Sequence, residues 1–334
     1  MTAHDPNVRL RDGVVFDLAT GETVVADAAE PAGDVNALTH AHGDHLYDRL
    51  PAGGELVCSS CTAGLAAARR REEPRPVPTD HPRVERLPSG HVAGSTALLA
   101  DDGEQRVLYT GDVSTRDRCY LDGFEPPEAD VLVVEATYGE PDYEFPPQAE
   151  LERVILDWLD DPERLDRPVL LFGYALGRAQ KLQALLRRSD RDRVLTTDAV
   201  QRLNTVVADH YDVSFPAGTY DAEAGLEPGD AVVLPAQLNG LDFVKRLAEE
   251  YDAPTAGFSG WAVDRSYRFA NDLDAAFPLS DHCDFGELVG LVEAVDPERV
   301  YTQHGSAAAL ADHLTGRGYE ARALRANQTA LSDF

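Results

Sequence analysis

The sequence predicts an α/β protein in which a smaller α/β domain is inserted into a larger one. Short apolar runs alternate with helical segments over residues 1–145, which indicates sheets covered by helices. A second series of alternating strands and helices fills 146–265. Residues 1–145 contain histidines and aspartates beside glycines directly after predicted strands, and this pattern occurs again only in 266–334. We therefore expect one domain built from 1–145 and 266–334, with the smaller domain between these two parts.

The first part of the chain consists mainly of short predicted strands. The sequence Asp101-Asp102-Gly103 predicts a hairpin between the apolar runs 97–100 and 106–109. A helix is expected at 62–71. The other expected strands are 23–26, 35–38, 56–58, 84–87 and 131–134.

Three prolines, Pro141, Pro146 and Pro147, mark the break before the inserted domain. Beyond them, the alternation of strands and helices is typical of a parallel sheet with its own small core. The expected helices are 148–159, 178–188, 199–209 and 241–251, and the expected strands are 168–172, 194–196 and 231–234. After 265 the chain is expected to return to the first domain with 273–278, followed by helix 285–295 and strand 299–302.

The chain carries 59 acidic and 30 basic residues, a formal net charge of −29, and its lysines are Lys181 and Lys245 alone. Such acidity usually argues against a nucleic-acid partner, because phosphate binding requires a basic surface. The acidic residues are spread along the whole chain, however, as in proteins from a cytoplasm of molar salt, where the Debye length is only about 3 Å. We therefore interpret the charge as a sign of a halophilic habitat. An acidic surface that binds cations or basic partners is the alternative.

The 334 residues contain no apolar stretch long enough to cross a bilayer. The N-terminus has no basic, hydrophobic leader. From these two observations we expect a soluble cytoplasmic protein without a membrane partner.

The most informative segment is Thr39-His40-Ala41-His42-Gly43-Asp44-His45, which follows the apolar run 35–38. Three histidines and one aspartate lie within six positions. A loop at the end of a strand directs alternate side chains into one pocket, and imidazole with carboxylate is the ligand set that suits zinc and its neighbours. The segment therefore predicts a metal site.

Further potential ligands follow later strands. His91 follows the run 84–87, Asp112 follows 106–109 and His304 follows 299–302, and each has a glycine as its neighbour. Loops at strand ends place functional groups on a rigid scaffold. We therefore expect these side chains to complete a site for two metal ions.

This ordered set resembles the metallo-β-lactamase superfamily, whose fold is an αββα sandwich with metals at one edge. The resemblance implies two zinc ions as cofactors, with manganese in place of one or both as the alternative. Asp27, at the end of strand 23–26, would orient the histidine loop, unless it is an ordinary turn aspartate. By this resemblance one ion would be held by His40, His42 and His91, the second by Asp44, His45 and His304, and Asp112 would bridge both.

Three further signals narrow the resemblance. Together with the inserted domain, they resemble the β-CASP branch of the superfamily, whose members hydrolyse RNA or DNA. Over about 24–325 the layout is most similar to short archaeal nucleases of the mRNA 3′-end processing factor type and to bacterial exonucleases associated with DNA ligases. The signals are Glu135 after the run 131–134, the segment Ser280-Asp281-His282-Cys283-Asp284, and the segment Tyr174-Ala175-Leu176-Gly177-Arg178-Ala179-Gln180.

The resemblance assigns catalytic roles to Asp44, His282 and Glu135. A histidine opposite the attacking water can protonate the leaving 3′-oxygen, and the carboxylate beside it would favour the imidazolium form. The alternatives are an ordinary histidine at a helix start and an ordinary strand-end carboxylate.

Candidate substrate-binding residues lie elsewhere. Gly177 and Arg178 open a helix, where backbone N–H groups and a guanidinium can bind phosphate, but a solvated helix arginine is the alternative. Ser95 follows the loop of His91 and is either a substrate contact or a turn residue. Phe258 and Trp261 either stack a base or pack in a core.

We expect a zinc-dependent nuclease in which two metal ions activate water to hydrolyse phosphodiester bonds. Single-stranded RNA, in mRNA 3′-end processing or decay, is the favoured substrate, and exonucleolytic trimming of DNA ends for ligase-associated repair is the first alternative. A small-molecule hydrolase of the lactonase or thioesterase type and a non-catalytic nucleic-acid-binding subunit are the others. The sequence lacks a strongly basic patch, which favours short or single-stranded RNA or DNA as the partner. For the oligomeric state, a homodimer is one of the alternatives.

Overall fold

The computed structural model describes residues 6–71 and 75–325. The chain divides into two compact units. Within the described residues, no helix combines the length and the apolar character needed to span a membrane. The first unit comprises Met1–Arg116, Asp122–Asp142 and His282–Phe334, and the second comprises Asp117–Leu121 and Tyr143–Asp281.

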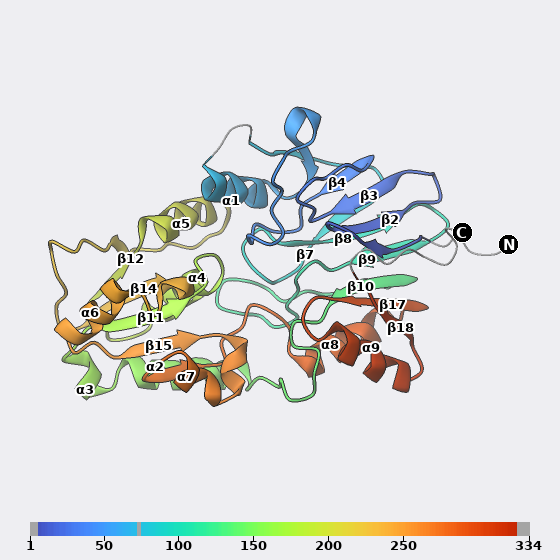
Figure 1. Ribbon diagram of the computed structural model, residues 1–334. Helices are drawn as coiled ribbons and strands as arrows, with labels where there is room; N and C mark the ends of the chain where they lie inside the picture. The colour runs from blue at the N-terminus through green and yellow to red at the C-terminus, as the bar shows by residue number, and fades with distance from the viewer. Residues whose placement is uncertain (1–5, 72–74, 326–334) are drawn as a thin grey trace. The chain divides into compact units, whose positions relative to one another are not determined.

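The first unit contains two six-stranded sheets (Figure 1). In the first sheet the strands follow the order β1-β2-β3-β4-β5-β6, with antiparallel pairing up to β3 and parallel pairing from β3 onward. Its strands are β1 (Arg9–Leu10), β2 (Val14–Asp17), β3 (Thr23–Ala26), β4 (Val35–Ala37), β5 (Glu55–Val57) and β6 (Val77–Thr79). A 3-10 turn, η1 (Ala52–Gly54), precedes β5.

The second sheet has the order β18-β17-β10-β9-β8-β7. From β18 to β9 all pairs are parallel, whereas β8 is antiparallel to both β9 and β7. The expected hairpin is confirmed, because β8 and β9 pair directly on either side of Gly103. The strands are β7 (Val84–Pro88), β8 (Thr96–Asp101), β9 (Arg106–Tyr109), β10 (Val131–Glu135), β17 (Arg299–Gln303) and β18 (Glu320–Ala323).

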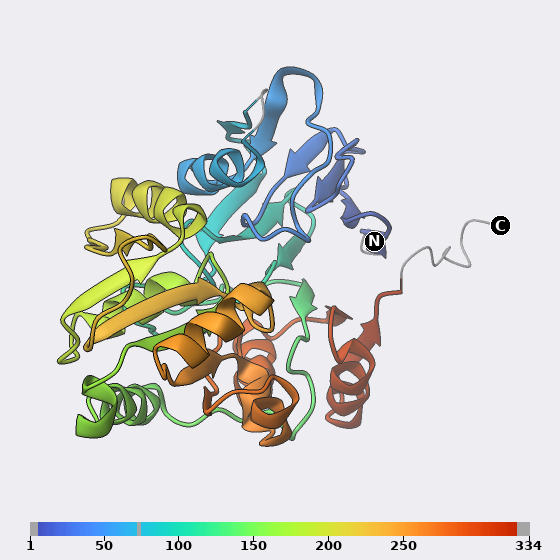
Figure 2. The same ribbon diagram turned by 60° about the vertical axis from the view of Figure 1, so that its left-hand side comes forward.

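Successive residues along the strands of the second sheet point to opposite faces, as the two-residue period of a strand requires, and each face is buried in a core of its own. One set, including Leu98 and Val133, packs between the two sheets with residues such as Phe16 and Val24 of the first sheet. The neighbouring set, including Leu132, packs on the opposite face with helices α8 (Phe285–Val295) and α9 (Ala307–Gly316). Both helices are labelled in Figure 1, and Figure 2 shows them from a second angle. Helix α1 (Ser60–Arg70) contacts β6.

The second unit is built on one parallel sheet with the order β13-β12-β14-β11-β15-β16. Its two faces bury separate cores, one with α2, α4 and α5, the other with α6 and α7. The strands are β11 (Val169–Gly173), β12 (Arg193–Thr196), β13 (Gly218–Thr219), β14 (Asp230–Pro235), β15 (Thr255–Phe258) and β16 (Ala275–Phe277). The helices are α2 (Gln148–Leu159), α3 (Pro162–Leu165), α4 (Arg178–Leu186), α5 (Asp198–His210), α6 (Asp242–Glu250) and α7 (Ser266–Ala270), with 3-10 turns η2 (Ala236–Leu238) and η3 (Gly260–Val263).

The inserted unit is longer than the expected 146–265. It begins at Tyr143 and continues to Asp281. The reason is that β16, which was expected to belong to the first domain, pairs with β15 and forms an edge of the parallel sheet. The chain therefore returns to the first unit at His282, not at residue 266.

Candidate metal centre

The histidine loop begins where β4 ends. This strand lies between β3 and β5, so pairing on both sides fixes the direction in which the chain leaves the sheet. His40, His42 and His45 are all buried. Polar groups are costly to bury without partners, so these imidazoles require contacts from other loops.

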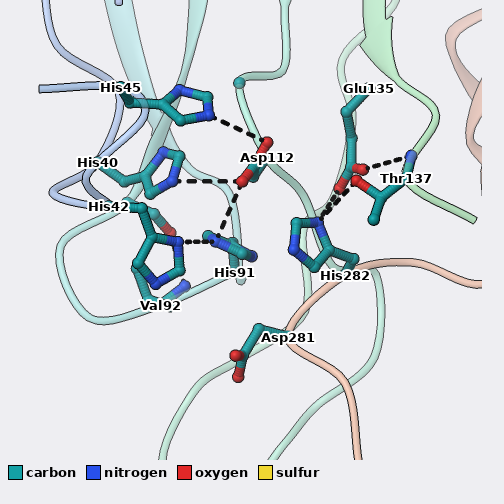
Figure 3. A network of polar contacts seen from close by, with 12 residues as sticks. His40, His42, His45, His91, Val92, Asp112, Glu135, Thr137, Asp281 and His282 are labelled. Carbon is teal, nitrogen blue, oxygen red and sulfur yellow. Dashed lines mark hydrogen bonds and ion pairs between the residues drawn. The ribbon is translucent and has the colours of Figure 1, made fainter. Parts of the chain in front are cut away.

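Those contacts come from the loops after β7 and β9. His40, His42, His91 and Asp112 each place one ligand atom within 4.8 Å of all the others (Figure 3). Nε2 of His91 lies 3.0 Å from Nδ1 of His42 and 3.4 Å from Oδ2 of Asp112. Nε2 of His40 lies 3.3 Å from the same carboxylate oxygen. Imidazole nitrogens and a carboxylate at this proximity fit a zinc-like ion.

The hydroxyl group of Thr39 selects the form of His40 that can bind a metal. Thr39 Oγ1 donates to Oδ2 of Asp27 at 2.6 Å, so it accepts from Nδ1–H of His40 at 3.1 Å. Nε2 of His40 then carries the lone pair, and this buried atom has no hydrogen-bond partner within the described part of the chain. Gly111 permits the close approach, because it has φ +54° and a Cβ there would lie 2.7 Å from Thr39 Oγ1.

Asp112 presents its two oxygens to different histidines. Oδ2 lies near His40 and His91, as given above, whereas Oδ1 lies 3.6 Å from Nε2 of His45. A carboxylate that bridges two ions has to be approachable from both sides. The geometry therefore suits the bridging role expected for Asp112.

The residues expected around a second ion are less closely gathered. Nε2 of His45 lies 3.9 Å from Oδ2 of Asp44, and the ring centroids of His45 and His304 are 5.4 Å apart. Asp44 and His304 are exposed, unlike the first set. Among the described residues, these three do not form a group with all ligand atoms within 4.8 Å.

The charges around the cluster favour metal binding at the first set. Burial and the adjacent His282 hold the pKa of His91 well below its ordinary value, and burial with His45 lowers the pKa of His40. Burial raises the pKa of Asp112, but His45 and His40 outweigh it and hold this pKa well below the ordinary value. Neutral imidazoles and an ionised carboxylate are the states that ligate a metal.

His45 differs from the first set. Burial lowers its pKa, but the carboxylates of Asp112 and Asp27 outweigh this and raise the pKa to about 10. Without metal, His45 therefore holds a proton near neutral pH. A second ion would have to displace that proton.

Asp27 is placed where it can support the histidine loop. Its Oδ1 accepts from the backbone N–H of Thr39 at 2.7 Å, and its Oδ2 lies 3.0 Å from Nδ1 of His45. Two residues that the sequence analysis did not identify complete this network. The hydroxyl of Tyr109 donates to Asp27 Oδ2 at 2.8 Å and accepts from Nε2 of Gln303 at 3.2 Å. Their positions in the sequence could have indicated this role, because each is the last residue of a strand that ends beside a predicted ligand loop.

His282 is paired with a fully buried carboxylate. Its Nδ1 lies 2.7 Å from Oε1 of Glu135, which also accepts from the backbone N–H of Val113 at 3.2 Å. Oε2 of Glu135 accepts from the N–H of Thr137 at 3.0 Å. The ring centroids of His282 and His91 are 4.5 Å apart, so this pair lies beside the metal cluster (Figure 3).

The three residues expected to bind substrate are placed differently. Ser95 is buried, and its Oγ accepts from the N–H of Val92 at 3.2 Å, so it has the turn role. Gly177 is buried, and its N–H donates to Oε1 of Gln180 at 2.8 Å. Arg178 is 3% exposed and pairs with Asp281 at 2.9 Å, so its guanidinium neutralises a buried carboxylate instead of facing solvent.

Similar proteins were found by sequence, although no family model matches the chain. A probable DNA ligase of Opitutus terrae is 34% identical over 297 residues, which are 86% of this chain and 28% of the ligase. Subunit 3 of the cleavage and polyadenylation specificity factor of Dictyostelium discoideum is 34% identical over 100 residues, 29% of this chain and 13% of that protein. An RNase J-like protein of Methanocaldococcus jannaschii is 30% identical over 100 residues, 29% of this chain and 24% of that protein. The chain thus spans less than a third of each of these relatives.

A similar fold occurs in the crystal structure of an Enterococcus faecalis protein of unknown function. The TM-score is 0.59 at 14% sequence identity, and the match covers 90% of this chain and 92% of the other. The likeness supports a mixed α/β fold over nearly the whole chain. The ordered ligand motifs, the buried cluster and the relatives above are consistent with the β-CASP branch of the metallo-β-lactamase superfamily.

Proposed function

We propose that the chain is a metal-dependent nuclease that hydrolyses phosphodiester bonds. The observation that carries this proposal is the pairing of His282 with Glu135 at 2.7 Å beside the cluster of His40, His42, His91 and Asp112. A metal cluster alone suits many hydrolases. An alkoxide is a poor leaving group, so a positioned proton donor next to the cluster favours phosphodiester hydrolysis.

Two zinc ions are the proposed cofactors, with manganese in place of one or both as the alternative. When bound, such ions supply Lewis-acid stabilisation of developing charge and a water that is nucleophilic at neutral pH. The proposed ligands are His40, His42 and His91 for one ion, Asp44, His45 and His304 for the other, and Asp112 for both.

The residues of the chain itself would control the proton that the leaving oxygen needs. Glu135 accepts from Nδ1 of His282, so the proton available for transfer is the one on Nε2. The N–H groups of Val113 and Thr137 hold both oxygens of Glu135, which fixes the ring orientation in turn. A positioned general acid typically contributes about 10²–10⁴-fold to the rate. In this scheme His282 protonates the leaving 3′-oxygen.

Single-stranded RNA, in mRNA 3′-end processing or decay, is the favoured substrate. The polyadenylation-factor subunit and the RNase J-like protein among the relatives support this choice by their names. Trimming of DNA ends is the second candidate. It is favoured by the similarity to a probable DNA ligase, which extends over 86% of this chain.

We also propose that the first unit is the αββα sandwich of this superfamily and that the second unit is the β-CASP domain. Two facing sheets with α8 and α9 on one outer face support the first assignment, and the parallel sheet inserted between β10 and β17 supports the second. The net charge of −29 supports a cytoplasmic setting of high salt.

The test is incubation of the purified chain with zinc in ~1 M KCl, where long-range repulsion is screened, with end-labelled RNA and DNA strands of one sequence. We expect RNA fragments that are absent with Asp112→Ala, and the fragment ladder will report the direction and mode of cutting. Cutting of DNA alone would favour the second candidate. Hydrolysis of a lactone or thioester with both strands intact would make the nuclease proposal wrong.

A further inference from the structure

Two exposed aromatic side chains follow the carboxyl ends of two neighbouring strands of the parallel sheet. Tyr174 follows β11 and is 48% exposed, and Trp261 follows β15 and is 40% exposed. The two strands are parallel neighbours, with Phe172 paired to Gly257, so both end at the same edge. Neighbouring strands are about 4.8 Å apart, and the carboxyl ends of strands are where open α/β sheets bind ligands.

The ring of Tyr174 packs against Arg178, which belongs to a buried charge network. The guanidinium carbon of Arg178 lies 3.9 Å from the centre of this ring. Arg178 is itself fixed by Asp281 at 2.9 Å and by the carbonyl oxygen of Phe258 at 3.3 Å, and Asp281 also binds Lys181 at 2.7 Å. In some proteins a buried ion network fixes one conformation of the groups around it. The network therefore holds an exposed ring in one orientation.

Trp261 is held in a different way. It lies in the short turn η3, and its ring packs edge-to-face against Tyr143 with 5.0 Å between centroids and an interplanar angle of 89°. Phe258, at the end of the same strand, behaves differently, because it is 1% exposed and stacks on Phe277 in the core. Of the two aromatics considered from the sequence, Trp261 is thus the one that reaches the surface.

We infer that Tyr174 and Trp261 form a stacking platform for the bases of single-stranded nucleic acid. This inference rests on the proposed nuclease function and names the contacts by which the inserted unit would hold the substrate. Rings that are already oriented lose little conformational freedom when they bind. Every nucleobase has a π-face, so such a platform accepts any sequence.

The charge of the chain favours bases over phosphates as the group that is bound here. With a net charge of −29, the protein repels the phosphate backbone as a whole, and Arg178 is already paired with Asp281. Stacking involves no net charge, so it persists where salt suppresses phosphate contacts. The platform and the acidic surface are therefore compatible.

The test measures binding of fluorescein-labelled eight-nucleotide RNA, DNA and abasic DNA strands by anisotropy, with the full chain kept from cutting by EDTA. We expect Tyr174→Ala and Trp261→Ala each to bind the base-containing strands about tenfold more weakly and the abasic strand unchanged. Tyr174→Phe and Trp261→Phe should bind the strands with the same affinity as the unsubstituted protein. Thermal unfolding of each variant will show that the fold is intact.

Phe269→Ala is the matched control. Phe269 is 71% exposed and carries Arg268 4.4 Å from its ring centre, but its neighbours Ala270 and Asn271 line a pocket with Thr255, at the opposite end of β15. Its loss should leave all three affinities unchanged. The inference is overturned if both alanine variants bind like the original chain, if they lose the abasic strand equally, or if the original chain does not prefer strands with bases. Base-dependent binding without cleavage in zinc would instead count against the nuclease function alone.

Discussion

Lys181 and Asp281 form an ion pair with no exposed surface, with 2.7 Å between Nζ and Oδ1. Burial lowers the pKa of Lys181, and the carboxylate of Asp281 opposes this shift. Arg178 binds the other carboxylate oxygen at 2.9 Å. Because Asp281 precedes His282 in the chain, this pair fixes the residue next to the proposed general acid.

Breaking this pair should strongly destabilise the second unit. Asp281→Asn leaves the charges of Lys181 and Arg178 buried beside a neutral amide, so we expect the free energy of unfolding to fall by about 3–5 kcal/mol. Adding Lys181→Met removes one of these two uncompensated charges, so we expect it to restore only part of that loss, because Arg178 stays buried without its carboxylate. Urea unfolding followed by tryptophan fluorescence measures this directly, because Trp158 and Trp261 both lie in the second unit.

An exposed pair of the same unit serves as the control. Arg153 and Asp157 are 2.9 Å apart with both side chains 64% exposed. Asp157→Asn should change the free energy of unfolding by no more than about 0.5 kcal/mol. An equally small change for Asp281→Asn would contradict the prediction, because it would show that the Asp281 carboxylate is not needed to compensate the buried positive charges.

His282→Ala should separate metal binding from catalysis. His282 is not among the proposed metal ligands, so we expect bound zinc to remain while kcat falls by about a hundredfold or more. Zinc per chain is measured by elemental analysis, and kcat from cleavage of a labelled strand. His210→Ala, which removes an exposed histidine of α5, should change neither quantity. Unchanged turnover in His282→Ala would remove its assigned role.

Asp112→Ala should abolish metal binding and activity together. Its two oxygens face different histidines, at 3.3 Å from His40 and 3.6 Å from His45, so both proposed ions depend on it. We expect zinc content and cleavage to fall in parallel. The exposed Asp101 offers a control, since Asp101→Ala should retain both. Full zinc content in Asp112→Ala would contradict the bridging role.

Thr39→Val should weaken zinc binding although Thr39 does not touch the metal. The substitution removes the hydroxyl that accepts from Nδ1 of His40 and donates to Asp27. Loss of such an outer contact typically lowers metal affinity about 10–100-fold, which a competition titration with a chelator will measure. Thr39→Ser keeps the hydroxyl and should retain most of the affinity. Equal affinities for the valine and serine variants would show that the hydroxyl does not select the state of His40.

The local elements could be predicted where the sequence pattern is strong. The expected helices 148–159 and 285–295 coincide with α2 and α8, and the expected strands 23–26 and 106–109 coincide with β3 and β9. The convergence of His40, His42, His91 and Asp112 also followed from their positions after strands, because loops that follow the strands of two facing sheets can meet at one end of these sheets. Period and turn signals are local, so a single sequence displays them.

Features that depend on distant partners could not be predicted in this way. Arg178 looks like a solvent-facing residue at a helix start, but its environment is set by Asp281, about a hundred positions later. The end of the inserted unit was misplaced for a similar reason, because only pairing with β15 shows that 275–277 belongs to the parallel sheet. Tyr109 and Gln303 were missed because their hydrogen bonds to the aspartate network cross from one strand to another.

The position of β17 has a consequence for the order of assembly during synthesis. β17 completes the second sheet beside β10, yet it follows the whole inserted unit in the chain. While the ribosome is still making the inserted unit, the backbone groups on one side of β10 therefore have no strand to pair with. Such an unpaired strand can pair incorrectly or aggregate. A nascent chain of this kind should depend on a chaperone, or on rapid folding of the inserted unit, until residues 299–303 emerge.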